Sequence, residues 1–430
     1  MSELETLSIH GGQEIDPATG SRAVPIYQTT SYGFKNSDHA ANLFALKEFG
    51  NIYTRLMNPT TDVLEKRMAE IHGGTGALAT ASGMSAITYS ILAITSAGEN
   101  IVTGDKLYGG TYTLFRHTLK RFGIEVRFVD TSNPENVRNS IDEKTKAVFT
   151  ESIGNPKCNL DDLDAIAAIA HDHNIPLIVD NTVSPPPVYQ PFEHGADIVV
   201  LSLTKMVGGH GTSVGGCIVE KGDFDWAKAG KFPTIVGPDE SYHGADFWEA
   251  FGNHDRAVVP GLAYVLKIRC GILRDTGACL SPFNAQQILL GVETLPMRAE
   301  RHCSNALAVA TYLEKHPAVS WVEYAGLEDH PDHQRSRENF PIGPGAIFGF
   351  GLKGGREAGK SFIDKVQLCS HLANVLDAKT LVIHPASTTH QQLTEQELVS
   401  AGVPQDMVRI SVGLEHIDDI LKDLEQALSN

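Results

Sequence analysis

The chain has 430 residues, of which 42% are hydrophobic, so it can bury a large core and is long enough for two or three domains. Its 35 basic and 52 acidic residues give a net charge of −17, which argues against nucleic acid or an anionic membrane surface as a partner. The first ten residues are polar and acidic, unlike a signal peptide, and no apolar run approaches the roughly 20 residues of a membrane span, so we expect a cytoplasmic protein.

Residues 1–60 contain Gly, Pro and Thr with little periodicity, which indicates an extended arm that needs a partner subunit to become ordered. Directly after this arm, the pattern DVLEKRMAEIHGG predicts a helix. We expect Asp62 to cap its beginning and Gly73 to end it.

Short β-rich runs then alternate with helical stretches. The runs lie at residues 77–80, 100–103, 125–129, 146–150, 176–180 and 197–202. This alternation is typical of an α/β fold with a mostly parallel sheet. Ligands bind in such folds where strands end and helices begin, because loops converge there and helix N-termini offer free N–H groups. Ser82, Tyr108, Asn155 and Asp180 all stand at such ends, so we expect them at one edge of the sheet.

The C-terminal half contains two further features. The aromatic-rich stretch 222–252 indicates an ordered insertion, and a second α+β region begins near residue 290. Its last helix, HIDDILKDLEQALSN, carries an apolar stripe at residues 417, 420, 421 and 424. We therefore divide the chain into an arm (1–60), a large domain (61–290) and a C-terminal domain (291–430).

The cysteines and histidines give no metal signal. The six cysteines lie far apart, without a CxxC pair, and are expected to be buried reduced thiols. His171 and His173 are two residues apart, so they would point to different sides of a helix.

Lys205 follows an apolar strand and two hydroxyl residues, Ser202 and Thr204. A lysine there is costly unless its charge is paired or removed. A covalent bond to an aldehyde removes the charge, and the hydroxyls suit a phosphate. Taken alone, the tetrapeptide SLTK also fits a lysine that merely caps a strand.

Two other positions fit the same kind of ligand. Asp180, 25 residues before Lys205, ends an apolar strand and could hold a pyridine nitrogen protonated, or simply cap a helix. Ser82, Gly83 and Met84 offer backbone N–H groups to a phosphate, or form a tight turn. A GxGxxG motif at dinucleotide-binding spacing is absent, which argues against a dinucleotide enzyme.

At this point the chain resembles the Cys/Met-metabolism enzymes that depend on pyridoxal phosphate (PLP). Nine ordered motifs carry the resemblance: HGG…DPATGSRAVPIYQTTSY, NIYTRLMNPT, ASGMSAI, DKLYGGTY, ESIGNP, VDNT, SLTK, HPASTTH and VRISVGLE. The family includes cystathionine synthases and lyases, methionine γ-lyase and O-acetylhomoserine sulfhydrylases. The resemblance implies the PLP-dependent transferase fold type I, similar to aspartate aminotransferase, with a mostly parallel sheet domain, a smaller α+β C-terminal domain and an N-terminal arm. It also implies PLP as cofactor and no metal.

The resemblance further implies roles for individual residues. Lys205, Asp180 and Tyr108 would be the catalytic residues, with Lys205 bonded to PLP, Asp180 paired with its ring nitrogen and Tyr108 stacked on its ring. The implied cofactor-binding residues are Lys205, Asp180, Tyr108, Ser82, Gly83, Met84, Thr182, Ser202 and Thr204, joined by Tyr53 and Arg55 from a neighbouring subunit. The implied substrate-binding residues are Asn155, Ser387 and Arg409, the last as a bidentate clamp on the substrate carboxylate. A shared site implies a homo-oligomer, usually a tetramer built from dimers.

Two features are similar to the sulfhydrylase branch of the family: HPASTTHQQL, where lyases typically have HPASMTH, and the insertion 222–252. That branch implies γ-replacement, in which O-acetyl-L-homoserine and sulfide give L-homocysteine and acetate, or methanethiol gives methionine. A methionine γ-lyase, a cystathionine γ-synthase, an O-succinylhomoserine sulfhydrylase or a PLP-bound protein with little turnover remain alternatives. The run VSPPP at 183–187 departs from the family pattern beside the cofactor pocket, which bears on substrate choice.

Overall fold

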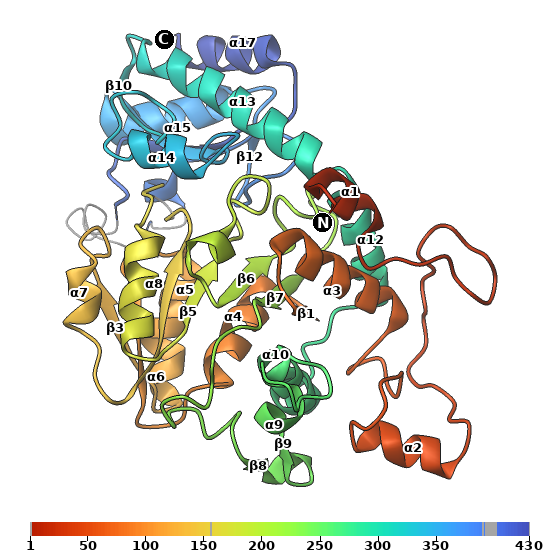
Figure 1. Ribbon diagram of the computed structural model, residues 1–430. Coiled ribbons are helices and arrows are strands. Elements are labelled where there is room, and N and C mark those ends of the chain that lie inside the picture. Colours follow the sequence, from red (N-terminus) through yellow and green to blue (C-terminus); the bar gives the residue numbers. More distant parts are fainter. Residues whose placement is uncertain (1, 155–156, 389–390, 392–401, 430) are drawn as a thin grey trace.

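The structure is a computed structural model that describes residues 2–154, 157–388, 391 and 402–429. A seven-stranded sheet forms the centre of a large body, and a five-stranded sheet forms that of a smaller body near the C-terminus (Figure 1). Helix α13 (Leu295–Glu314) runs from the large body along the smaller one. Within the described ranges, no helix is both long enough and apolar enough to cross a membrane.

The large sheet is parallel over most of its width. Its strands, in spatial order, are β1 (Gly76–Thr80), β7 (Gly216–Glu220), β6 (Ile198–Ser202), β5 (Leu177–Asp180), β4 (Thr145–Glu151), β2 (Asn100–Gly104) and β3 (Glu125–Val129). Strands β2, β3, β4, β5 and β6 run parallel to one another, whereas β7 is antiparallel to both of its neighbours. The strands predicted at six positions are therefore confirmed, and the buried strand β7 is one that the sequence pattern did not predict.

The prediction for one helix of the large body needs correction. The helices are α3 (Pro59–His72), α4 (Gly83–Leu92), α5 (Gly109–Thr113), α6 (Leu119–Arg121), α7 (Glu135–Arg138), α8 (Leu163–Asp172), α10 (Ala263–Ile268), α11 (Arg274–Thr276) and α12 (Pro282–Glu293). Of these, α3, α4, α6, α8 and α10 pack on the sheet. Asp62 does not begin α3, because the Asn58 side chain accepts from the N–H of Thr60 at 2.9 Å and Pro59 has the φ angle of a first helical residue. Gly73 ends α3 with a φ of 70°, as predicted.

The arm and the insertion flank the large body. Helix α1 (Leu4–His10) packs against α3, α12 and α13, whereas α2 (Ser37–Phe44) projects from the molecule (Figure 1). The insertion contains β8 (Pro238–Asp239), β9 (Ala245–Asp246) and α9 (Phe247–Phe251). It is ordered, as expected, because its aromatic residues are buried: the ring of Trp226 stacks on that of Tyr264 with centroids 5.1 Å apart.

The smaller body consists of a mostly antiparallel sheet covered by helices. The strands, in spatial order, are β10 (Val319–Glu323), β11 (Ile347–Leu352), β14 (Met407–Ser411), β13 (Leu381–Ile383) and β12 (Ser370–His371), and the helices are α13, α14 (His333–Asn339), α15 (Gly355–Lys365) and α17 (Ile417–Leu428). Helix α17 buries Ile420 and Leu424 of the predicted apolar stripe. Helix α12 spans residue 290, and the domain limits at residues 60 and 290 stay predictions.

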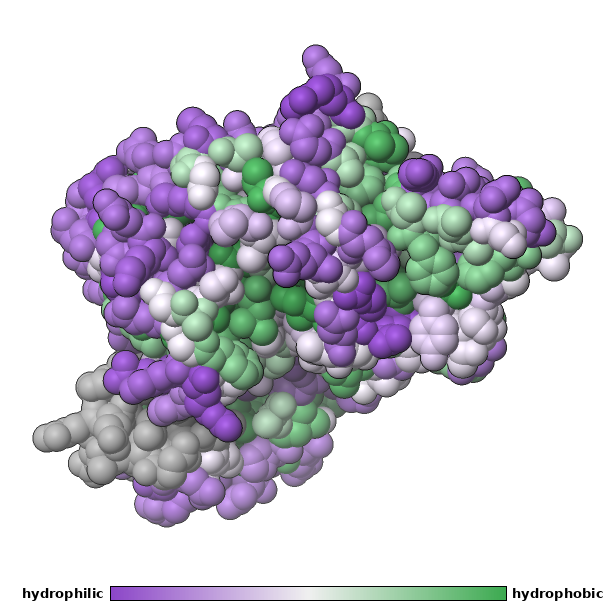
Figure 2. Space-filling view, turned by 90° about the horizontal axis from the view of Figure 1, so that it is seen from below, coloured by the Kyte–Doolittle hydropathy of each residue, from purple (hydrophilic) through white to green (hydrophobic). Residues whose placement is uncertain are grey.

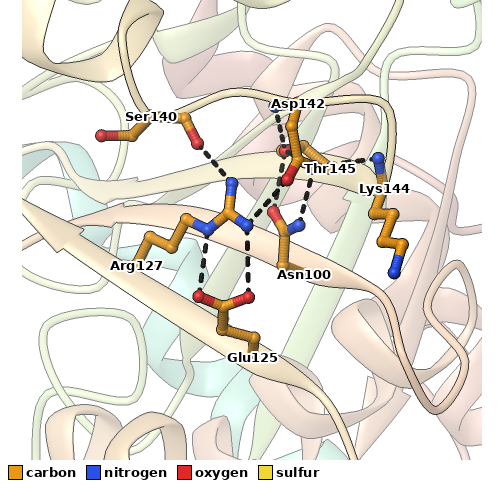
Figure 3. A network of polar contacts seen from close by, with 7 residues as sticks. All are labelled: Asn100, Glu125, Arg127, Ser140, Asp142, Lys144 and Thr145. Atoms are coloured by element: carbon orange, nitrogen blue, oxygen red, sulfur yellow. Dashed lines mark hydrogen bonds and ion pairs between the residues drawn. The ribbon is translucent and has the colours of Figure 1, made fainter.

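A polar network ties the amino ends of β2, β3 and β4 together (Figure 3). The Arg127 guanidinium contacts Glu125 and donates to Asp142 Oδ2 at 2.7 Å. Asn100 donates to Asp142 Oδ1 at 2.9 Å and accepts from the Thr145 hydroxyl at 2.7 Å. The Asn100 hydrogen bond and the Arg127 charge hold the pKa of Asp142 well below its usual range. This network stabilises the end of the sheet opposite to the carboxyl ends of the strands.

We expect Asn100→Ala to lower the free energy of unfolding by about 1–3 kcal/mol, because Asn100 is buried and two partners lose a hydrogen bond. Urea unfolding followed by circular dichroism measures the loss. Lys144→Ala is the matched control, because Lys144 takes part through its backbone N–H, which the substitution keeps. Equal stability of Asn100→Ala and the parent protein would contradict this account of the network.

Candidate active site

A cavity of about 260 Å³ lies where the carboxyl ends of β4, β5 and β6 meet the N-terminus of α4 and the edge of the smaller body. Two carboxyl groups, an amine and a guanidinium line it, those of Glu151, Asp180, Lys205 and Arg409. Seven other predicted site residues also lie in its wall: Ser82, Gly83, Met84, Tyr108, Thr182, Ser202 and Thr204. The structure therefore brings together residues that are up to 327 positions apart in the chain, as the positions of Ser82 and Arg409 show.

Lys205 stands in the turn that follows β6. Its Nζ donates a hydrogen bond to Asn374 Oδ1 at 2.5 Å, and Gly209 N–H donates to the Lys205 carbonyl at 2.7 Å. Burial, aided by the positive charge of Arg409, lowers the pKa of Lys205. A lowered pKa increases the fraction of neutral amine, which is the form that attacks an aldehyde or accepts a proton.

Asp180 ends β5 as a buried carboxyl group. Its Oδ1 accepts from the N–H of Thr182 at 2.9 Å, and burial raises its pKa to about 6. Within the described residues, no lysine or arginine forms an ion pair with Asp180. A cationic group placed in the cavity would therefore stabilise the ionised carboxylate.

The N-terminus of α4 offers free N–H groups that suit an anion. Ser82 caps the helix, and the first-turn N–H groups of Gly83 and Met84 have no acceptor within the helix. A Cβ atom on Gly83 would lie 2.6 Å from the Cβ of Ser202, so glycine allows α4 to approach the end of β6. The Thr204 hydroxyl accepts from the N–H of Gly215 at 3.1 Å, which fixes the turn beside this site.

Tyr108 and Glu151 contact each other in the wall of the cavity. Tyr108 precedes α5, its side chain is 51% exposed, and its N–H donates to Glu151 Oε1 at 2.6 Å. Burial and the neighbouring carboxyl of Asp180 raise the pKa of Glu151 well above its usual range.

Arg409 enters the cavity from β14 of the smaller body. It pairs with Gly349 and Ile383 in the sheet, and burial lowers its pKa, although an arginine remains charged in proteins. No carboxylate in the part of the chain that the structure describes forms an ion pair with it. A buried guanidinium facing a cavity suits the carboxylate of an incoming molecule.

Three of the predicted residues that the structure describes, Tyr53, Arg55 and Ser387, do not line this cavity. Tyr53 and Arg55 line a separate hollow on the arm, where Arg55 donates to the Arg274 carbonyl at 2.7 Å. Ser387 lies in a short 3₁₀ helix (Pro385–Ser387), with its Oγ 2.8 Å from His384 Nδ1. Asn155 lies outside the described residues. The roles of these residues stay predictions, and for Tyr53 and Arg55 the expected role concerns the site of a neighbouring subunit.

The sequence reasoning missed two polar residues of the cavity wall, Glu151 and Asn374. Glu151 is the last residue of β4 and begins the motif ESIGNP, so the rule that singled out Asp180 would have found it. Asn374 had no local signal, because it belongs to an irregular stretch of the smaller body and meets Lys205 only in the folded chain.

The cavity fits PLP, the cofactor that the resemblance implies. A buried amine of lowered pKa suits the aldehyde, and a buried carboxyl group without a cation suits a protonated ring nitrogen. The N-terminus of α4 suits the phosphate, and the half-exposed ring of Tyr108 suits stacking. Residues of this chain thus match the aldehyde, the ring nitrogen, the phosphate and the ring face of the cofactor.

Comparisons with known proteins point in the same direction. The family model described as "Cys/Met metabolism PLP-dependent enzyme" matches residues 5–429. An O-acetyl-L-homoserine sulfhydrylase of Leptospira meyeri is 56% identical over 427 residues, which cover 99% of this chain and 96% of that protein. O-acetyl-L-homoserine sulfhydrylase 1 of Thermus thermophilus is 52% identical over 428 residues, which cover 99% of this chain and 100% of that protein. A crystal structure from Campylobacter jejuni with N'-pyridoxyl-lysine-5'-monophosphate at its position 205 has 41% identity, a TM-score of 0.94 and full coverage of both chains.

We expect Asp180→Asn to stabilise the protein when PLP has been removed. Asp180 is buried, and its pKa rises from 3.8 to about 6 on folding, so ionisation costs on the order of 3 kcal/mol in the folded state. The cost is absent below pH 3.8, grows between the two pKa values and is complete above about pH 6. Thermal or urea unfolding of the two apoproteins should therefore show a gain for Asp180→Asn that is lost on acidification. A gain that does not depend on pH would contradict this reasoning.

Proposed function

Because this chain belongs to the Cys/Met metabolism PLP-dependent enzymes, we propose that it catalyses γ-replacement, in which O-acetyl-L-homoserine and sulfide give L-homocysteine and acetate. Its fold is that of PLP-dependent enzymes of fold type I, and PLP is its cofactor. The observation that carries the proposal is the identity of 56% and 52% to O-acetyl-L-homoserine sulfhydrylases over 99% of the chain. The reaction makes the protein a transferase of homocysteine and methionine biosynthesis that moves an alkyl group other than methyl.

Different residues of the cavity can have different roles in this reaction. Bound PLP withdraws electrons from the substrate, which makes its Cα and Cβ protons acidic. Lys205 Nζ is held by Asn374 and its pKa is lowered by burial, so its neutral form can take the proton from Cα and return it. Asp180 stabilises a positive charge at the ring nitrogen, and Arg409 holds the substrate carboxylate.

The second half of the reaction consists of the departure of the leaving group and the addition of the nucleophile. Acetate is a much weaker base than hydroxide, so it departs from Cγ more readily once a Cβ proton has been removed. Sulfide then adds at Cγ, and methanethiol in its place would give methionine. Apolar side chains such as Ile153, Val183 and Val214 line the same cavity and reduce its water content, which disfavours hydrolysis. A cytoplasmic location stays a prediction from the sequence.

We expect purified protein with PLP to make homocysteine from O-acetylhomoserine and sulfide, faster than from O-succinylhomoserine. Lys205→Ala should remove the visible absorption of bound PLP and lower turnover roughly 10²–10⁴-fold, because it removes both the covalent anchor and the proton carrier. A coupled thiol assay and an absorption spectrum measure these effects. Product formation only with cysteine would instead identify a cystathionine γ-synthase, and ammonia with 2-oxobutyrate from methionine would identify a methionine γ-lyase.

We also propose that the enzyme is a homo-oligomer, a tetramer built from dimers that share active sites. The arm supports this proposal, because Phe34, Phe44, Phe49 and Tyr53 are 42–53% exposed on it. Apolar surface continues between the body and the projecting arm in the view from below (Figure 2). A hollow of about 610 Å³, lined by residues such as Leu46, Phe49 and Leu262, lies between the arm and the body. A second copy of the chain would cover these side chains and place its own arm beside the cavity.

Mixing two inactive variants tests the sharing of sites. Lys205→Ala has an intact Arg55, and Arg55→Ala has an intact Lys205. If Arg55 serves the neighbouring subunit, each mixed dimer contains one complete site, and co-expression should restore about a quarter of the parent activity by random pairing. Separately purified variants give the baseline. Activity of the mixture no higher than this baseline would show that Arg55 acts within its own chain or not at all.

A further inference from the structure

Two buried carboxyl groups lie side by side in the cavity wall. Glu151 ends β4 and Asp180 ends β5, and the two residues are direct partners in the parallel ladder. Asp180 has a role opposite the ring nitrogen of PLP. Glu151 has none in the reaction described above, although it is 6% exposed and faces the same cavity.

The contact that Glu151 makes is with the backbone of Tyr108. Its Oε1 accepts the Tyr108 N–H at 2.6 Å, and this bond joins the residue before α5 to the central sheet. The ring of Tyr108 is half exposed and leans on its own helix, because a Cβ on Gly110 would lie 2.5 Å from Tyr108 Cε1. The position of the ring therefore depends on the position of its backbone, which Glu151 sets.

The charges around Glu151 disfavour its ionised form. The groups that face it are the carboxyl of Asp180 on β5, the buried carboxyl of Asp161 in the segment before α8, and the N–H of Tyr108. Lys205 and Arg409 line the same cavity, but neither forms an ion pair with Glu151 among the residues that the structure describes. Burial and Asp180 both raise the pKa of Glu151, and a carboxylate here would place a second negative charge beside Asp180.

We propose that Glu151 is a positioning residue that acts as a neutral acid: it fixes the N–H of Tyr108, and through it the ring that covers the cofactor, without adding charge beside Asp180. A neutral Glu151 leaves Asp180 as the carboxylate that pairs with the ring nitrogen. The inference rests on the PLP site of the proposed function, and it concerns how this chain prepares that site before any substrate binds.

The test measures PLP affinity by titrating apoprotein, which requires no knowledge of the substrate. Glu151→Gln keeps the acceptor and stays neutral, so its dissociation constant should remain within about threefold of the parent value. Glu151→Ala removes the acceptor and should bind PLP about tenfold more weakly, as expected for the loss of one hydrogen bond at a site that organises a ligand. If Glu151→Gln binds as weakly as Glu151→Ala, an ionised carboxylate is required and the proposal is wrong.

Glu220 provides the matched control. It is also a buried glutamate that accepts a backbone N–H, that of Val265 at 2.9 Å, and burial raises its pKa to about 8. It pairs in the sheet with Ile198, at the amino end of β6 and thus away from the cavity. Glu220→Ala should lower the melting temperature and leave PLP affinity unchanged. A loss of PLP affinity in Glu220→Ala equal to that in Glu151→Ala would reduce the effect at Glu151 to general destabilisation and overturn the proposal.

A double-mutant cycle with Tyr108→Ala shows whether Glu151 acts through Tyr108. In that background, adding Glu151→Ala should change PLP affinity less than about twofold, because there is no ring left to position. A full tenfold loss would show that Glu151 contacts the cofactor directly, which contradicts a positioning role. The visible circular dichroism of bound PLP should weaken in Glu151→Ala and persist in Glu151→Gln. If the parent protein binds no PLP, the proposed function itself is refuted. If the parent protein binds PLP but the affinities of the variants do not follow the expected order, only this inference is refuted.

Discussion

Buried charge without a partner is the constraint around which the site is built. Asp180, Lys205 and Arg409 line one cavity, yet they form no ion pairs with one another or with other residues in the described ranges. Removing an ionised group from water is expensive, and the shifted pKa values of all three groups express that cost. Each cost is offset when a ligand supplies the complementary charge or removes the charge by a covalent bond. This pattern of unmet charges suits the charged groups of PLP and of an amino acid, as the proposed function requires.

The fold creates this pattern by combining two bodies. The parallel strands β4, β5 and β6 carry Glu151, Asp180 and the turn of Lys205 to one edge of the sheet, whereas Arg409 comes from the smaller body. Helix α13 connects the two. Its buried Arg298 donates to the carbonyls of Met206 at 2.6 Å and Val207 at 3.0 Å, directly after Lys205. The reactive lysine is therefore fixed by contacts from both bodies, with Asn374 holding its amine and Arg298 its backbone.

The parts of this arrangement that depend on local chemistry could be predicted from the sequence. Alternating runs predicted six of the strands, and the cost of an unpaired lysine after an apolar strand drew attention to Lys205. The predicted start of α3 at Asp62 was wrong, because Asn58 caps the helix and Pro59 is its first residue. Asn374 and the strand β7 were missed because they acquire their roles only through partners far away in the chain. The place of Tyr108 after a strand was predicted from the sequence pattern, whereas its stacking role and the role of Arg409 came from the resemblance. The roles proposed for Tyr53 and Arg55 require a second chain.

The energetic cost at Asp180 also makes the cofactor part of the conformational stability of the protein. A ligand that binds only the folded chain raises its free energy of unfolding with the logarithm of the free ligand concentration. If the ring nitrogen of PLP pairs with Asp180, as proposed, binding also relieves an unfavourable buried charge, so the chain without cofactor opens more often and is the better substrate for proteases. On the proposed pairing, a single carboxyl group at the end of β5 couples the resistance of the folded chain to proteolysis to the concentration of free cofactor.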